Sequence, residues 1–131
     1  PRPSRQVRPA ARIVVMLVQS VTVGVPVSDH TRSADWYRLA FELDQPDLEP
    51  VEGVVEFRVG GVWLQLVRGA TTAGAGPVIR IGVPDVAAER ARLTALGVPV
   101  GGLERVGGFL EYFDFADPDG NRLSLYTELE A

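Results

Sequence analysis

The chain has 131 residues but no cysteine, no lysine and a single histidine, His30. Without cysteine there is no disulfide, no thiolate zinc site and no cysteine nucleophile. Without lysine, Schiff-base chemistry and a phosphate-loop lysine are also excluded, and all 13 basic residues are arginines. Because the absence of cysteine fits a reducing compartment, we expect a cytoplasmic protein.

Long apolar runs and excess positive charge are missing as well. No stretch approaches the roughly 20 apolar residues of a membrane-spanning helix, so we expect no membrane association. The net charge of −4 does not favour a nucleic-acid partner. Residues 1–15 are basic and contain no acid. We expect the protein to start at Met16, with residues 1–15 a basic N-terminal extension and residues 16–131 one domain.

What the sequence does contain is an internal repeat. The segments that begin at Val23 and Ile79 each show an apolar strand pattern that ends in Val-x-Asp and leads into a helical pattern. The aspartates, Asp29 and Asp85, fit N-cap positions, where a carboxylate accepts hydrogen bonds from free helical N–H groups. The second helix should end near Gly97, with a core-facing stripe of Val86, Leu93 and Leu96.

Several strands are predicted after each helix. Residues 54–67 indicate a hairpin around Gly60-Gly61, and residues 109–126 indicate a hairpin with a longer corner, Asp-Pro-Asp-Gly-Asn. Residues 43–50 and 67–77 are expected to be connecting loops. The repeated unit is therefore βαβββ, with module one at about 17–68, a linker at about 69–76 and module two at about 77–128.

This duplication, with Val-x-Asp before each helix and Asp-Pro-Asp-Gly-Asn before the last strand, resembles the glyoxalase/bleomycin-resistance/dioxygenase superfamily, the vicinal oxygen chelate proteins. The resemblance runs from Leu17 to about Glu128. It implies an α+β fold in which two tandem βαβββ modules form a curved mixed-sheet cup with the helices on its outer face. It also implies that a small molecule binds in the cup, and that a second subunit completes the sheet edges to give a homodimer.

Strand alternation assigns the side chains to two sheet faces. Val21, Val23, Val25 and Val27 should share the core face. The opposite face should hold the ligand-binding residues, which combine aromatic, arginine and polar side chains: Thr22, Arg58, Trp63, Gln65, Arg80, Tyr112, Asp114, Arg122, Ser124 and Tyr126. A simple solvated sheet face is the alternative, but the aromatic content favours a cleft.

The resemblance also allows a test for a metal site. Metal-dependent members take one ligand from each of four strands, usually His near the start of a module and Glu or Gln in its last strand. The matching positions here are Thr22, Gln65, Val78 and Ser124. Because a divalent ion needs imidazole or carboxylate donors, we expect no metal and no cofactor. We expect Ser124 to be a small neutral residue in the wall of the cup. We expect His30 to be a solvated residue beside a helix cap or, alternatively, a pH switch.

These observations predict a metal-free small-molecule binding protein that resembles the bleomycin-resistance branch and sequesters an aromatic or anionic ligand, with no catalytic residue. Aromatic rings would stack on the ligand, with Trp36 as a further candidate, and arginines would hold its anionic groups. Cross-strand pairing with Glu56 or Asp114 is the alternative role of these arginines.

Two other functions remain open. The protein could be a lyase-, isomerase- or dioxygenase-type enzyme of the same superfamily with an atypical or lost metal site, acting on a small oxygenated metabolite. Arg80 and Arg122 would then stabilise an oxyanion, with Glu56 or Asp114 as base. A regulatory or assembly role without a small ligand is the third reading.

Overall fold

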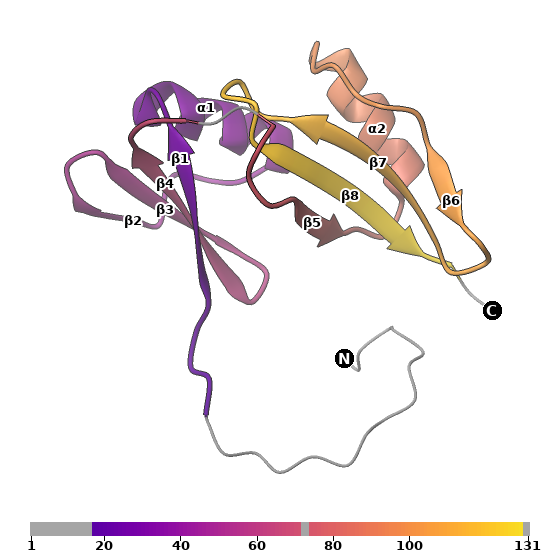
Figure 1. The fold of residues 1–131 in the computed structure, drawn as a ribbon, viewed down its shortest axis with the longest axis horizontal. Coiled ribbons are helices and arrows are strands. Elements are labelled where there is room, and N and C mark those ends of the chain that lie inside the picture. The colour runs from indigo at the N-terminus through magenta and orange to yellow at the C-terminus, as the bar shows by residue number, and fades with distance from the viewer. Residues whose placement is uncertain (1–16, 72–73, 130–131) are drawn as a thin grey trace.

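The computed structural model describes residues 17–71 and 74–129, so the expected extension at 1–15 lies outside the described residues. Two βαβββ modules follow one another along the chain (Figure 1). Module one contains β1 (Thr22–Val27), α1 (His30–Phe41), β2 (Leu48–Val51), β3 (Val54–Val59) and β4 (Val62–Arg68). Module two contains β5 (Ile79–Gly82), α2 (Val86–Ala95), β6 (Glu104–Val106), β7 (Leu110–Ala116) and β8 (Arg122–Glu128).

Each module is one four-stranded mixed sheet with a helix. The strand orders are β1-β4-β3-β2 and β5-β8-β7-β6, and the first strand of each module runs parallel to its last. Helix α1 packs on β3 and β4, and α2 packs on β7 and β8. In Figure 1 both helices lie toward the top of the picture, where α1 overlaps the end of β1. This arrangement confirms the predicted α+β fold of two tandem βαβββ modules. Both predicted loops were too long, because β2 begins inside the segment 43–50 and β4 extends to Arg68, inside the segment 67–77.

The helix ends follow from local sequence. Asp29 accepts a hydrogen bond from the Arg32 N–H, and Asp85 accepts one from the Ala88 N–H, each at 3.1 Å. Both aspartates are therefore N-caps, as predicted. Helix α2 ends at Ala95, and Gly97 has a φ of +86°, a left-handed conformation that glycine adopts without strain. No helix in the described part of the chain is long and apolar enough to cross a membrane.

The two modules share one hydrophobic core. Strand alternation predicts its sheet residues well, since Val25, Val27, Leu66 and Leu123 are all buried. Other core residues come from both helices and both sheets: Ala34, Tyr37, Ala40, Val55, Phe57, Leu64, Val86, Leu93, Phe113, Phe115 and Leu125.

Two expected core positions were wrong. Val21 is 49% exposed because it precedes β1, and Leu96 is 48% exposed because it follows the last residue of α2. A residue just beyond an element no longer follows that element's period, so the pattern places it on the wrong side.

The Asp-Pro-Asp-Gly-Asn corner between β7 and β8 joins the modules. Asp117 accepts hydrogen bonds from the backbone of Asp119 and Asn121, as expected of a turn residue. The same carboxylate accepts the Tyr37 hydroxyl from α1 at 2.7 Å. The Asn121 side chain donates to the Pro26 carbonyl at 2.9 Å, and Asp119 accepts the Ser28 N–H at 3.2 Å. The corner of module two is thus bonded to the first strand and helix of module one.

Candidate functional site on the open sheet face

The sheet face that points away from the helices, here called the open face, has the same layout in both modules. Its middle row crosses the first, last and third strands of each sheet. In module one the row is Gly24, Gln65 and Glu56, and in module two it is Arg80, Ser124 and Asp114. Gly24 and Arg80 occupy equivalent places in the repeat. The two halves therefore present different chemistry at matched positions, and only module two has an arginine there.

Module one holds its polar groups in internal contacts. The Gln65 amide donates to the Glu56 carboxylate at 2.6 Å. The guanidinium carbon of Arg58 lies 5.1 Å from the centroid of the Trp63 ring, a cation–π contact. Arg58 thus stacks on Trp63, whereas the alternative role predicted from the sequence was pairing with Glu56 or Asp114. Thr22, opposite Trp63 in the register, is exposed on this face.

In module two, Arg80 is the central group of the open face. Its Nη1 atom donates to the Ser124 hydroxyl at 3.3 Å and lies 4.0 Å from the Asp114 carboxylate. The Arg80 and Asp114 side chains are 56% and 62% exposed, so water screens this ion pair strongly. Within the described part of the chain, Nε and Nη2 of Arg80 have no hydrogen-bond partner. They remain available as donors to an anion.

Ser124 does not form the wall that the sequence predicted. It is 1% exposed, and its hydroxyl donates to the Phe113 carbonyl at 3.2 Å while accepting from Arg80. The side chain is short, so it lies below the longer arginine and aspartate on the neighbouring strands. Ser124 therefore orients Arg80 and offers no surface of its own to a ligand.

A tyrosine pair lies at the far end of the same sheet. Tyr112 and Tyr126 are opposite each other on β7 and β8, and both are half-buried. Gly82 on β5 leaves room for the Tyr126 ring, because a Cβ atom at Gly82 would lie only 3.1 Å from the ring. This close approach was not anticipated from the sequence, although a glycine inside a strand pattern is a signal of it.

Arg122 supports the start of β5. Its Nε and Nη2 atoms both donate to the Gly76 carbonyl, at 3.1 and 2.6 Å. It still lines a cavity of about 440 Å³ together with Arg80, Val78 and Asp114. Two arginines therefore face one cavity, and Arg122 uses two of its three guanidinium nitrogens to hold the Gly76 carbonyl, whereas Arg80 uses one to hold Ser124.

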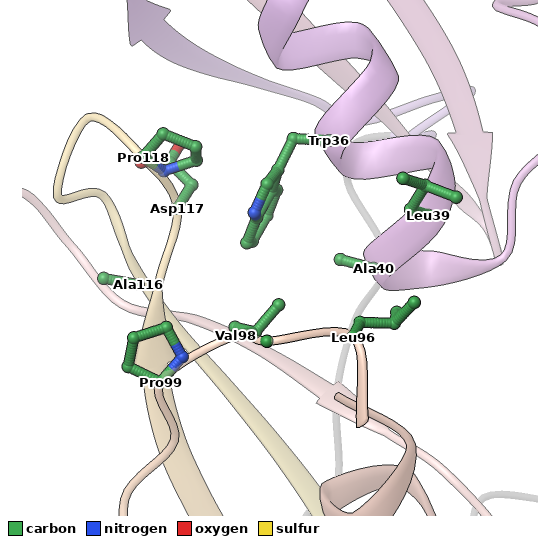
Figure 2. Close-up of a pocket in the computed structure, with 10 residues that line it drawn as sticks. Trp36, Leu39, Ala40, Leu96, Val98, Pro99, Ala116, Asp117 and Pro118 are labelled. Carbon is green, nitrogen blue, oxygen red and sulfur yellow. The ribbon is translucent and has the colours of Figure 1, made fainter. Parts of the chain in front are cut away.

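A second and larger cavity, of about 680 Å³, lies between β5 and the hairpin of β3 and β4. Trp63 of module one and Arg80 of module two both line it. A separate groove of about 510 Å³ lies on the helical side, and Figure 2 shows Trp36 pointing into it from α1, opposite Pro118 and Pro99. Trp36, the further stacking candidate, is thus remote from the open face.

The residues at the family's metal positions do not fit a divalent ion. Val78 has no donor atom, Thr22 and Ser124 offer only neutral hydroxyls, and Gln65 is bonded to Glu56. Among residues 17–71 and 74–129, no three His, Asp or Glu side chains converge on a point where they could hold a metal. The carboxylates Glu56 and Asp114 lie in equivalent rows of different sheets, so they do not rebuild such a site.

His30 lies outside the open face. It opens α1 and lines a pocket of about 210 Å³ with Arg38 and Glu49. Its Nδ1 atom is buried and has no hydrogen-bond partner among the described residues, so the imidazole is less solvated than the sequence suggested.

The chain belongs to the glyoxalase/bleomycin resistance protein/dioxygenase superfamily, which it matches over residues 19–125. The antibiotic-binding protein TnmS3 from Streptomyces sp. CB03234 is 26% identical, with a TM-score of 0.73 over 88% of this chain and 99% of that one. Fosfomycin resistance protein FosX from Listeria monocytogenes is 19% identical, with a TM-score of 0.71 over 87% and 94%.

A further structural neighbour is lactoylglutathione lyase from Agrobacterium tumefaciens. It is 21% identical, with a TM-score of 0.68 over 82% of this chain and 91% of that one. No relative of curated function matches the sequence. Since the similar structures include both a binding protein and a lyase, the likeness establishes the fold and leaves the activity to be argued from the site.

Proposed function

We propose that this protein binds a small aromatic or anionic molecule on its open face and sequesters it without metal and without chemical change. The observation that carries the proposal is Arg80, which lines two cavities and whose guanidinium is held by Ser124, while its Nε and Nη2 have no hydrogen-bond partner among the described residues. Trp63 lines the larger cavity with it. An arginine with free donors beside an aromatic ring suits a planar ligand with an anionic group.

The similarity to an antibiotic-binding protein supports the same function, since that neighbour is 26% identical over nearly its whole length. A planar antibiotic with an acidic group is therefore the ligand class to test first, and a resistance role in the cytoplasm would follow from its sequestration. The other residues of the predicted set contribute in this proposal as ring surfaces (Tyr112, Tyr126) or polar neighbours (Thr22, Gln65, Asp114).

A thermal-shift screen of planar aromatic carboxylates and antibiotics tests the proposal. A ligand at a hundredfold excess over its Kd stabilises the folded protein by about 2.7 kcal/mol, which such a screen detects. Calorimetry on Arg80→Gln then checks the site, with a loss of about tenfold in affinity expected. Arg105→Gln is the matched control, because Arg105 is also a strand arginine with a carboxylate neighbour, Glu111, at 3.5 Å. Equal losses in both variants would contradict the assignment.

A metal-free enzyme is the second candidate, and Glu56 is the observation that favours it. Its carboxylate lies on the open face and is held at 2.6 Å by the Gln65 amide, as an oriented base would be. Incubating the bound ligand with the protein and following it by mass spectrometry decides between the two. Turnover that Glu56→Gln abolishes, with binding retained, would replace the binding proposal with the enzyme.

A further inference from the structure

The cavity of about 680 Å³ passes between the two sheets. Strands β1 and β5 belong to different sheets, and each is hydrogen-bonded to only one neighbouring strand within the described residues. The cavity wall includes Val23, Leu64 and Ile81, which pack on the core side, together with Trp63 and Arg80 of the open face. The space therefore connects the open face with the hydrophobic core.

The lining of this cavity is chemically one-sided. Arg80 is the only charged residue among its lining residues in the described chain, and the others are apolar, aromatic or glycine. The Arg80 charge lies on the open face, while Phe41, Val59 and Ile79 form an apolar wall of the cavity. A ligand that matches this surface has one anionic end and an apolar body.

The charge of the ligand is limited by Asp114. Its carboxylate lies 4.0 Å from Nη1 of Arg80 and is 62% exposed. One anionic group can use the Nε and Nη2 donors, but a second negative charge on the same group would add to the repulsion from the nearby Asp114 carboxylate, which water screens only in part. A monoanion is therefore favoured over a dianion.

We infer that the cavity between the modules binds the apolar part of an amphiphilic monocarboxylate, with Arg80 holding the carboxylate at the open face. This inference rests on the proposed function and specifies its ligand class. The apolar body lies between β5 and the β3–β4 hairpin, and Val62 at the start of β4 borders its path.

Calorimetric titration of the full chain with hexanoate, octanoate, decanoate and dodecanoate, each below its micelle concentration, tests the inference. Burial of each added methylene should tighten binding by about fourfold until the cavity is full. Alkylamines of the same lengths should bind at least tenfold more weakly, because their charge faces Arg80. Arg80→Gln should weaken all four carboxylates by a similar factor, whereas Arg105→Gln should weaken none.

Val62→Phe places a larger side chain at the cavity wall and should weaken dodecanoate far more than hexanoate. Val54→Phe is the matched control, since Val54 is also a half-buried valine at the start of a strand, β3, but does not line the cavity. Circular dichroism confirms that both variants fold. These differences between short and long chains, and between the two variants, are the supporting result.

Three results would overturn the inference. Affinity independent of chain length, or unchanged by Val62→Phe, would mean that only the open face binds; the proposed function then stands if planar carboxylates still need Arg80. Dissociation of a dimer by Val62→Phe would mean that a second copy of the chain fills the cavity. If neither alkanoates nor aromatic carboxylates bind the wild-type protein, the inference and the proposed function both fall.

Discussion

At the level of single residues, the surroundings of the Tyr37 hydroxyl have the largest consequence for how stability depends on pH. The side chain is fully buried and donates to Asp117 at 2.7 Å. Burial first, and the nearby Asp117 carboxylate second, raise the pKa of Tyr37 well above its ordinary value. The folded state keeps a proton that the unfolded chain loses above about pH 10. The stability from this group is thus complete below that pH and declines as the pH rises further.

We therefore predict that Tyr37→Phe loses about 1–3 kcal/mol at pH 7, because Asp117 loses a buried donor. Between pH 9.5 and 11.5 the wild type should lose stability more steeply than the variant. The chain has no lysine to titrate in that window, so the difference is easy to resolve. Urea unfolding across the range measures it, with Tyr112→Phe as the half-buried control. Parallel curves for wild type and Tyr37→Phe would disprove the linkage.

A second residue-level prediction concerns Ser124. Ser124→Glu would place a carboxylate where the side chain is 1% exposed and should cost several kcal/mol unless Arg80 pairs with it, as expected for a buried charge. It should not create a metal site, because Val78 and Thr22 still supply no strong donor. Thermal unfolding and metal analysis measure the two effects. Stoichiometric Zn or Mn in this variant would reject our reading of the donor set.

The two-residue period of a strand predicts which sheet face a side chain lies on, but it does not predict which neighbours that side chain contacts. The period placed Val25, Leu66 and Leu123 in the core and Arg80 opposite them, because every strand residue must choose one face. It could not reveal that Ser124 would be covered by its longer neighbours, or that Arg58 would stack on Trp63. Those outcomes depend on side-chain lengths across three strands. No sequence pattern linked Asp117 to Tyr37, which lies in the other module.

At the level of elements, strand β5 has a glycine, Gly82, at the point where the Tyr126 ring lies against it. A Cβ atom on Gly82 would lie 3.1–3.3 Å from atoms of the Tyr126 side chain, so Gly82→Ala must displace the ring. We predict a loss of about 1 kcal/mol, or about 4 °C in Tm. Gly24→Ala is the control on β1, where the nearest atom would be the Gln65 amide oxygen at 3.7 Å, an ordinary contact. A smaller Tm loss for Gly82→Ala than for Gly24→Ala in calorimetric scans would contradict this account.

The corner between β7 and β8 is the other decisive element. Asn121 bonds both Pro26 of module one and Asp117 of its own turn. We predict that Asn121→Ala destabilises both modules together, by about 1–3 kcal/mol, because they share this contact and one core. Fluorescence follows module one, which contains both tryptophans, and circular dichroism follows the whole chain. Separate transitions by the two probes would show that the modules unfold independently.

For the whole molecule, we predict a homodimer. The outer strands β2 and β6 are sheet edges, and Phe109, Val106 and Leu103 near the β6–β7 hairpin are 71%, 50% and 39% exposed. Edges and exposed apolar side chains of this kind are ordinarily covered by a partner. Light scattering after size exclusion should give twice the 14.2 kDa mass of the chain at micromolar concentration. A single species at the mass of one chain would refute the prediction.

The bonds of the β7–β8 corner also constrain how the chain can be made. They join residues that are 80, 91 and 95 positions apart, so the first helix leaves the ribosome long before its partners do. At about 5–20 residues per second, several seconds of translation separate Tyr37 from Asp117. During that interval module one has a tyrosine hydroxyl without its acceptor and an uncovered apolar surface. The nascent chain therefore cannot complete these contacts of its first half before the last hairpin emerges.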